Sequence, residues 1–293
     1  MSGNGRKLDV GVASYRNPER LRATLESIRR QSVTDWRCLI FHNPSDNAAD
    51  EAACQCVIAA AIVEDPRFVV EWLPENVGYA GAVNEILARS SSEYVAFCDN
   101  DIEILTHGWD EILCSYLDRF HELGFIAPNG GAYPIQRPGY VEVLWAVGFA
   151  WVVPRAMLEE VGFMDITLGH QNEVDWETRI RMAGFTIAAA PEVRVAHHAT
   201  ATNDPASMDR INKGVQSWVN KWASYHGGKN LNYHSPNVLR FEDWPPTALY
   251  LENWWAQKLP GLNANPEVVT VEGREYDLIR VPRLKGFYRN RTI

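Results

Sequence analysis

The chain has 293 residues, a hydrophobic fraction of 46% and a formal net charge of −9 at pH 7. This length and composition permit one large folded domain, or a domain with a sizeable appendage, around an apolar core. The acidic balance and the lack of any long lysine or arginine run argue against nucleic acid as the main partner, and no nucleic acid is expected.

Cysteine usage and the apolar runs bear on the compartment. The five cysteines have no metal-type spacing and fall mostly in apolar settings, which favours reduced, buried thiols. No hydrophobic signal region follows the first residues, and the longest apolar run, 143–154, is too short to span a bilayer. We therefore expect a cytoplasmic protein with no transmembrane segment.

Apolar runs alternate with helical periods in the first hundred residues. Strands are predicted at 8–14, 36–41, 68–72 and 94–98. Helices are predicted at 19–31 and 51–62, and a third begins within 74–84 and runs to about 89. Strands that alternate with helices at this spacing indicate an α/β fold, Rossmann-like, with a mostly parallel sheet flanked by helices.

The second half is more varied. A helix is predicted at 108–123, a strand at 124–128, a Gly/Pro-rich surface loop at 129–140 and strand-like pieces within 141–153. Helices follow at 156–161 and 173–183, the latter stopped by Gly184, and strands at 185–190 and 194–196. Residues 208–225 look helical, and the Trp-rich remainder has no clear period. We predict a domain at 1–204, with halves at about 1–107 and 108–204, and a helical or irregular C-terminal extension at 205–293.

The strand at 94–98 ends in two carboxylates, Asp99 and Asp101. Open α/β folds bind ligands at the carboxyl ends of their strands, and residues i and i+2 of extended chain point the same way. Mg²⁺ and Mn²⁺ take oxygen ligands and often share them with a phosphorylated substrate. The pair therefore indicates a metal–diphosphate site, although taken alone it is explained equally well by a polar turn.

Five segments together carry a resemblance to a known family. They are Val12 to Leu21 with Leu25 to Gln31, Asn76 to Asn84, Tyr94 to Asp101, Gly148 to Asp165, and Asn172 to Arg179 with Ala183 to Phe185, Pro191 and His197-His198. In this order, over roughly residues 8–200, they resemble the inverting nucleotide-sugar glycosyltransferases of family 2, which have the GT-A fold. The resemblance implies a metal-dependent transferase that moves a sugar from a UDP- or GDP-linked donor to a glycan or other hydroxyl acceptor, with inversion.

The resemblance implies roles for the acids and the late histidines. Asp101 would bind Mn²⁺ or Mg²⁺ directly, Asp99 would reach the ribose or the metal, and His198 or His197 would complete the coordination. A His-His pair is also an ordinary feature of a strand end at the surface.

The catalytic base is assigned through the same resemblance. Glu173 stands where the family has its usual base, with Asn172 in place of the preceding acid, and Asp175 is the second candidate. Acids in the first turn of a helix also stabilise that helix and need do nothing else. Arg179 is expected to pair with Asp175.

The donor and acceptor sites are predicted more broadly. Aromatic faces suit a sugar ring, so Trp145, Trp151 and Trp176 are acceptor candidates, although tryptophan is more often a core residue. His42-Asn-Pro-Ser45 replaces the family's Asp-Asn-x-Ser turn, so no nucleoside is favoured. Glycines let the backbone approach a ligand. The predicted donor-binding residues are Ser14, Tyr15, Arg16, Asn43, Asn76, Gly78, Tyr79, Asn84, Asp99 and Asn100.

Three alternatives stay open. A sugar nucleotidyltransferase has the same nucleotide and metal needs, but a Gly-rich basic loop would be expected after the first strand. A catalytically silent sugar-nucleotide or glycan-binding module would not need Asp99, Asp101 and Glu173 together. The extension could serve as a lid, an acceptor clamp or the contact of a homodimer.

Overall fold

The computed structural model describes most of the first two hundred residues and short pieces of the rest. The described residues are 7–128, 130–132, 134–143, 145–166, 168, 171–198, 213–214, 217–218, 267–271, 274–279 and 287–290.

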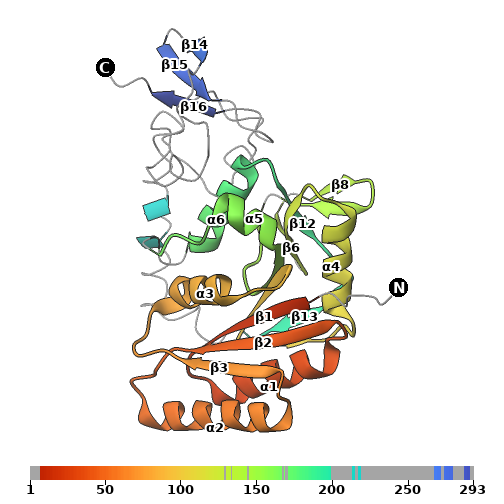
Figure 1. Ribbon diagram of the computed structural model, residues 1–293, viewed down its shortest axis with the longest axis vertical. Helices are drawn as coiled ribbons and strands as arrows, with labels where there is room; N and C mark the ends of the chain where they lie inside the picture. The colour runs from red at the N-terminus through yellow and green to blue at the C-terminus, as the bar shows by residue number, and fades with distance from the viewer. Residues whose placement is uncertain are drawn as a thin grey trace.

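A nine-stranded sheet is the centre of the fold, in the order β3-β2-β1-β4-β11-β6-β12-β9-β8 (Figure 1). The first four of these strands pair in parallel, while β11 lies antiparallel between β4 and β6, and β12 runs parallel to β6. The strands are β1 (Lys7–Ser14), β2 (Asp35–His42), β3 (Phe68–Trp72), β4 (Tyr94–Asp99), β6 (Leu123–Ala127), β8 (Ile135–Arg137), β9 (Tyr140–Glu142), β11 (Ala150–Pro154) and β12 (Thr186–Ala189).

Helices cover both faces of this sheet. In β4, Ala96 and Cys98 join an apolar cluster with α1, α2 and α4, whereas Val95 and Phe97 join a second cluster with α3, α5 and α6. This alternation is the period-2 pattern of a strand buried on both faces. The helices are α1 (Pro18–Gln31), α2 (Ala48–Glu64), α3 (Gly78–Arg89), α4 (Trp109–Arg119), α5 (Arg155–Val161) and α6 (Asn172–Met182).

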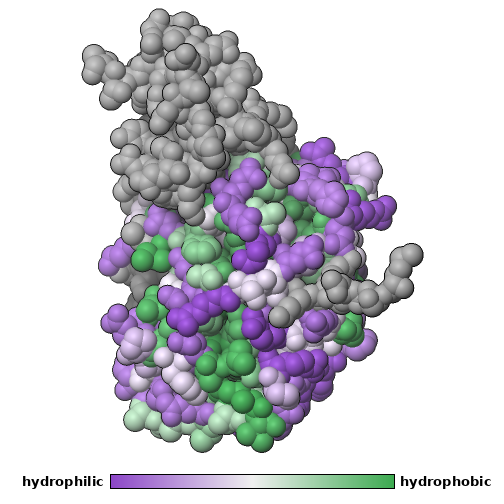
Figure 2. Space-filling view, viewed as in Figure 1, coloured by the Kyte–Doolittle hydropathy of each residue, from purple (hydrophilic) through white to green (hydrophobic). Residues whose placement is uncertain are grey.

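The expected α/β architecture, with helices flanking a large sheet, is confirmed. The helix at 172–182 is followed by Ala183 and then by Gly184, whose φ is +87°. None of the helices that the structure describes is long and apolar enough to cross a bilayer. Figure 2 shows mostly hydrophilic residues on the described part of this face, with an apolar patch low in the view, where α2 and β3 lie in Figure 1.

Two small sheets complete the carboxyl edge. β5 (Ile102–Ile104) follows β4 almost directly and pairs antiparallel with β13 (Val195–His197), with His197 opposite Ile102. β7 (Gly130–Ala132) pairs with β10 (Trp145–Ala146). The first of these sheets brings a segment from almost a hundred residues later in the chain next to Asp101.

Two predicted boundaries were wrong. The helix expected at 108–123 ends at Arg119, because Leu123 already pairs in the sheet as part of β6. The loop expected at 129–140 contains β7 and β8 and the start of β9. β8 and β9 form a local hairpin around Pro138-Gly139. β7 and β9 also pair with β10 and β12, which lie further along the chain, so local Gly and Pro content could not reveal those two pairings.

Part of the extension forms strands that the sequence did not predict. β14 (Glu267–Val271), β15 (Arg274–Ile279) and β16 (Phe287–Asn290) form an antiparallel sheet. The strands are rich in β-branched and aromatic residues, and two residues separate β14 from β15, which is a hairpin signal. Most of the helix predicted at 208–225 lies outside the described residues. The division at 204 remains a prediction.

Candidate active site

Two acids and one histidine meet beyond the end of β4. His197 Nε2 lies 3.2 Å from Asp101 Oδ1 and 3.8 Å from Asp99 Oδ2, and one ligand atom from each of the three residues falls within 4.8 Å of the others. The backbone N–H of His198 donates to Asp101 O at 2.9 Å, and the ring of Phe149 stacks on His197 at 4.7 Å between centroids. These contacts fix the histidine beside the acids, and the donor set suits a divalent cation.

The two adjacent histidines point to different partners. His198 Nε2 lies 3.9 Å from Glu103 Oε2, and His198 does not belong to the group formed by His197 with the acids. Successive side chains of a strand point to opposite faces, so only one residue of the pair can face Asp101. Of the two expected metal ligands, the geometry therefore favours His197 and not His198.

The acids of this site lie close enough to influence one another. Burial first, and then the negative charges of Asp101 and Glu173, raise the pKa of Asp99 well above its usual value. Burial also raises the pKa of Glu173, partly offset by hydrogen bonds from its own backbone and from Tyr79. Glu173, in the first turn of α6, thus belongs to the same electrostatic site as the Asp-Asn-Asp segment.

Glu173 lies tightly against the segment that precedes β11. A Cβ atom built on Gly148 would lie 2.8 Å from Glu173 Oε1, so only glycine fits at this position without displacing the carboxylate. The hydroxyl of Tyr79, in the first turn of α3, donates to Gly148 O at 3.3 Å. Gly148 opens one of the segments that resemble the family, but sequence reasoning gave it no role in the site.

Asp175 differs from Glu173 although it is only two residues away. Its Oδ2 accepts a hydrogen bond from Arg179 Nε at 2.9 Å, and both side chains are almost completely buried. The same guanidinium donates to the backbone carbonyls of Val161 and Phe163, at 3.2 and 2.7 Å. The expected pair with Arg179 is present, and these contacts fasten α6 to the end of α5. They do not favour the catalytic role expected for Asp175.

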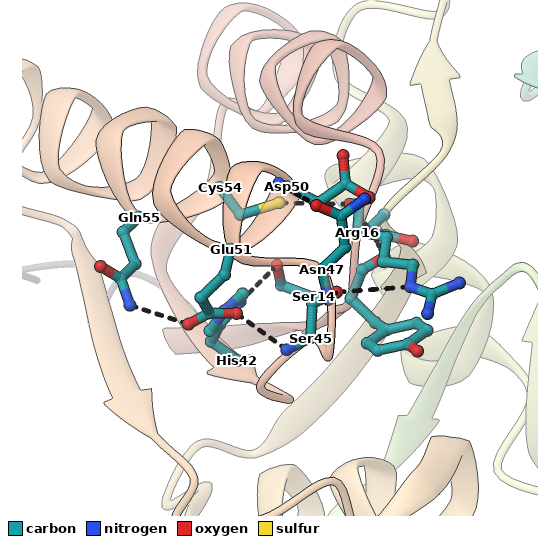
Figure 3. A network of polar contacts seen from close by, with 11 residues as sticks. Ser14, Arg16, His42, Ser45, Asn47, Asp50, Glu51, Cys54 and Gln55 are labelled. Atoms are coloured by element: carbon teal, nitrogen blue, oxygen red, sulfur yellow. Dashed lines mark hydrogen bonds and ion pairs between the residues drawn. The ribbon is translucent and has the colours of Figure 1, made fainter.

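The ends of β1 and β2 are joined by a buried polar network, shown in Figure 3. Ser14 Oγ lies 3.0 Å from His42 Nδ1, and His42 Nε2 lies 3.0 Å from Glu51 Oε2. The same Glu51 oxygen accepts from Ser45 N at 2.8 Å. Sequence reasoning missed His42 and Glu51 as members of one network. The replacement of the family's aspartate by His42 was the available signal.

The loop after β1 has unusual backbone geometry. Arg16 and Asn17 have φ values of 52° and 53°, a left-handed conformation that non-glycine residues rarely adopt. Asn100 Nδ2 donates to the carbonyls of Tyr15 and Arg16, at 2.9 and 3.3 Å. Arg16 pairs with Asp46, and its guanidinium lies 4.9 Å from the centre of the Tyr15 ring. The middle residue of Asp-Asn-Asp thus ties this loop to the acidic site.

Three further amides shape the loop before α3. Asn43 Oδ1 accepts from Val77 N at 3.0 Å, and Asn76 Oδ1 accepts from Gly78 N at 2.9 Å, where Gly78 has a φ of +74°. Asn84, expected at the donor, instead exchanges two hydrogen bonds of 2.9 Å with the backbone of Met164. Its amide therefore fastens α3 to the chain after α5.

Two of the three acceptor tryptophans are core residues. Trp151 and Trp176 are fully buried, with ring centroids 5.3 Å apart, and Trp151 stacks on Phe97 at 5.2 Å. The expectation that they contact the acceptor is therefore wrong, because neither offers a face to solvent. Trp145, on β10, is partly exposed and remains available.

Two curated relatives share part of this sequence. One is an uncharacterized glycosyltransferase of Bacillus subtilis, YwdF, 22% identical over 238 residues that span 75% of this chain and 84% of the relative. The other is a teichoic acid poly(glycerol phosphate) polymerase of Staphylococcus epidermidis, 28% identical over 138 residues, 47% of this chain and 18% of the polymerase.

Two solved structures share the fold. The mannosyltransferase PcManGT from Pyrobaculum calidifontis, in complex with GDP-Man and Mn²⁺, superposes with a TM-score of 0.60 at 15% identity, over 74% of this chain and 65% of its own. GalNAc-T7 with UDP, GalNAc and Mn²⁺ superposes with a TM-score of 0.59 at 12% identity, over 82% of this chain and 54% of its own. This chain therefore spans about half to two thirds of those proteins.

The family model described as glycosyl transferase family 2 matches residues 9–143, from β1 to the strands beyond the Asp-Asn-Asp segment. The relative that shares most of its length with this chain is named a glycosyltransferase, and the solved neighbours have the GT-A fold. Residues 9–143 are therefore similar to glycosyl transferase family 2, and the chain has the GT-A fold.

Proposed function

We propose that this glycosyltransferase moves a sugar from a nucleoside-diphosphate sugar to an acceptor hydroxyl with inversion, at the site formed by Asp99, Asp101, His197 and Glu173. The observation that carries the proposal is the convergence of these residues from β4, β13 and α6, and the influence of the Glu173 charge on the pKa of Asp99. The two solved neighbours contain Mn²⁺ together with GDP-Man or UDP, which supports a donor of this class.

The metal would be held by Asp101, Asp99 and His197. Two carboxylates and an imidazole are suitable ligands for Mn²⁺ or Mg²⁺. The negative charges of Asp99 and Asp101 repel each other, and a divalent cation bound between them would offset that repulsion. A bound divalent cation would neutralise the charge that develops on the departing nucleoside diphosphate.

Glu173 would act as the general base. It takes the proton of the acceptor hydroxyl as that oxygen forms a bond to the anomeric carbon, while the bond to the diphosphate breaks and its electron pair leaves with the phosphate. Burial raises the pKa of Glu173, which makes the carboxylate a stronger base than an exposed glutamate. Asp175 has a structural role in this proposal, since Arg179 neutralises it inside the protein.

The donor would lie along the loops that follow β1 and β2 and enter α3. Tyr15 and Arg16 would flank the nucleoside, while Asn43, Asn76 and Gly78 shape the backbone beside it. Trp145 is the acceptor-side aromatic residue retained from the sequence predictions. We propose 1–204 as the catalytic unit.

A thermal-shift screen of the full chain tests the donor assignment. UDP- and GDP-sugars are added with and without Mn²⁺, and a bound donor at 100 times its Kd stabilises the fold by about 2.7 kcal/mol. The selected donor is then used to measure nucleoside diphosphate release, with Asp101→Ala as the control. Metal-dependent binding without turnover, whatever acceptor is supplied, would favour a sugar-nucleotide-binding module instead.

A further inference from the structure

We propose that Tyr79 is a positioning residue for Glu173, and that its hydroxyl and the backbone of Gly148 hold the carboxylate in one orientation toward the acceptor. The inference rests on the proposed function, because it gives the orientation of Glu173 a role in the reaction. It concerns a tyrosine that the sequence placed only among donor-binding residues.

Tyr79 is itself firmly held. Its ring packs edge-on against Phe97 of β4, with centroids 5.5 Å apart at an interplanar angle of 88°. Its hydroxyl donates to Gly148 O at 3.3 Å, and it lies close enough to the Glu173 carboxylate for each group to affect the pKa of the other. Residues from α3, α6 and the segment before β11 therefore meet at one hydroxyl group.

Gly148 limits the carboxylate from the other direction. A Cβ atom on this residue would lie 2.8 Å from Glu173 Oε1, 2.9 Å from Cγ and 3.1 Å from Cδ. Contacts this short are not tolerated between nonbonded heavy atoms, so the carboxylate lies directly on the glycine backbone. The slot between Gly148 and Tyr79 leaves Glu173 few rotamers.

The Tyr79 hydroxyl remains a donor. Burial first, and then the negative charges of Glu173 and Asp99, raise the pKa of Tyr79 well above its usual value, so the phenol keeps its proton. That single proton is donated to Gly148 O in this structure, and a rotation of the hydroxyl would direct it to the Glu173 carboxylate, an ionised acceptor that forms stronger hydrogen bonds. The charged groups that face Glu173 are the acids Asp99 of β4 and Glu177 of α6. Tyr79 adds a neutral donor to this acidic surrounding.

The test is Tyr79→Phe, which keeps the ring against Phe97 and removes the hydroxyl. The assay measures nucleoside diphosphate release from the UDP- or GDP-sugar selected by the thermal-shift screen, with Mn²⁺. We expect kcat to fall by about tenfold to a hundredfold, since a hydrogen bond to a charged group is lost, with the KM for the donor unchanged. Tyr116→Phe is the matched control, because it removes a 2.6 Å bond to Glu192 at the surface. It should leave kcat unchanged.

A double-mutant cycle separates positioning from packing. If Tyr79 acts through Glu173, adding Tyr79→Phe to Glu173→Gln should cause little further loss of kcat. Gly148→Ala, whose new methyl group displaces the carboxylate, should lower kcat like Tyr79→Phe while the melting temperature shows a folded protein. Tyr79→Phe with wild-type kcat, or with the same loss in the Glu173→Gln background, overturns the proposal. Full activity of Glu173→Gln alone would instead overturn the proposed function.

Discussion

Replacing Glu173 by glutamine is the most direct perturbation of the proposed mechanism. The amide has nearly the same shape as the carboxylate, so it fits above Gly148 and its oxygen still accepts from Tyr79. What it loses is the ability to take a proton. The variant should therefore bind metal and donor normally and fail at the chemical step.

The expected loss follows from the role of the group. A positioned general base contributes on the order of 10²–10⁴-fold to a rate, which corresponds to about 2.7–5.5 kcal/mol of transition-state stabilisation. Burial raises the pKa of Glu173 and leaves it a stronger base, so we expect a loss within this range. Among the residues that the structure describes, no charged partner holds this side chain in the way that Arg179 holds Asp175, so the melting temperature should change little.

Asp175→Asn is the matched control from the same helical turn. It leaves the buried guanidinium of Arg179 without its carboxylate, which costs about 3–5 kcal/mol and lowers the melting temperature by roughly 6–20 °C. Below that temperature its kcat should stay near the wild-type value. The assay is nucleoside diphosphate release at saturating donor and Mn²⁺, read beside a thermal melt. A Glu173→Gln enzyme within threefold of the wild type would refute the assignment of the base.

The remaining predictions concern the metal and the sheet. Asp101→Asn should abolish the Mn²⁺-dependent rise in melting temperature and His197→Ala should weaken it, whereas an unchanged Mn²⁺ shift in both would place the metal elsewhere. Burial alone would raise the pKa of Asp9, but hydrogen bonds from residues 90–92 and the charge of Arg37 hold it below its usual value. Its ionised form therefore stabilises the fold above about pH 4, and the contribution is lost as pH falls through the lowered pKa. The difference in urea midpoint between wild type and Asp9→Asn should shrink from pH 6 to pH 3, and a constant difference would contradict this. Gly11→Ala would place a Cβ 2.2 Å from Ile86 Cγ2, so we expect a loss of about 1–3 kcal/mol by urea unfolding, and a stable variant would show that α3 can shift away from β1.

Much of the site was accessible from the sequence because its signals are local. The strand at 94–98 and the two acids that follow it, Asp99 and Asp101, can be predicted from adjacent residues alone. The carboxyl end of a strand in an α/β fold lies at the ligand-binding edge of the sheet. The Asn76–Gly78 turn depends on adjacent residues in the same way. Glu173 was reached only through the family resemblance, since acids are common at helix starts.

Other parts of the site depend on which distant segments meet. The alternation of strands and helices, and the acids at the end of β4, were determined by the sequence alone because hydrophobic period and residue order act over a few neighbouring residues. The pairing of β13 with β5 selected His197 over His198, and the packing of α6 directed Glu173 and Asp175 to opposite roles. Only the tertiary structure decides such outcomes, because the side of a strand or helix that faces a ligand is set by contacts between residues many positions apart.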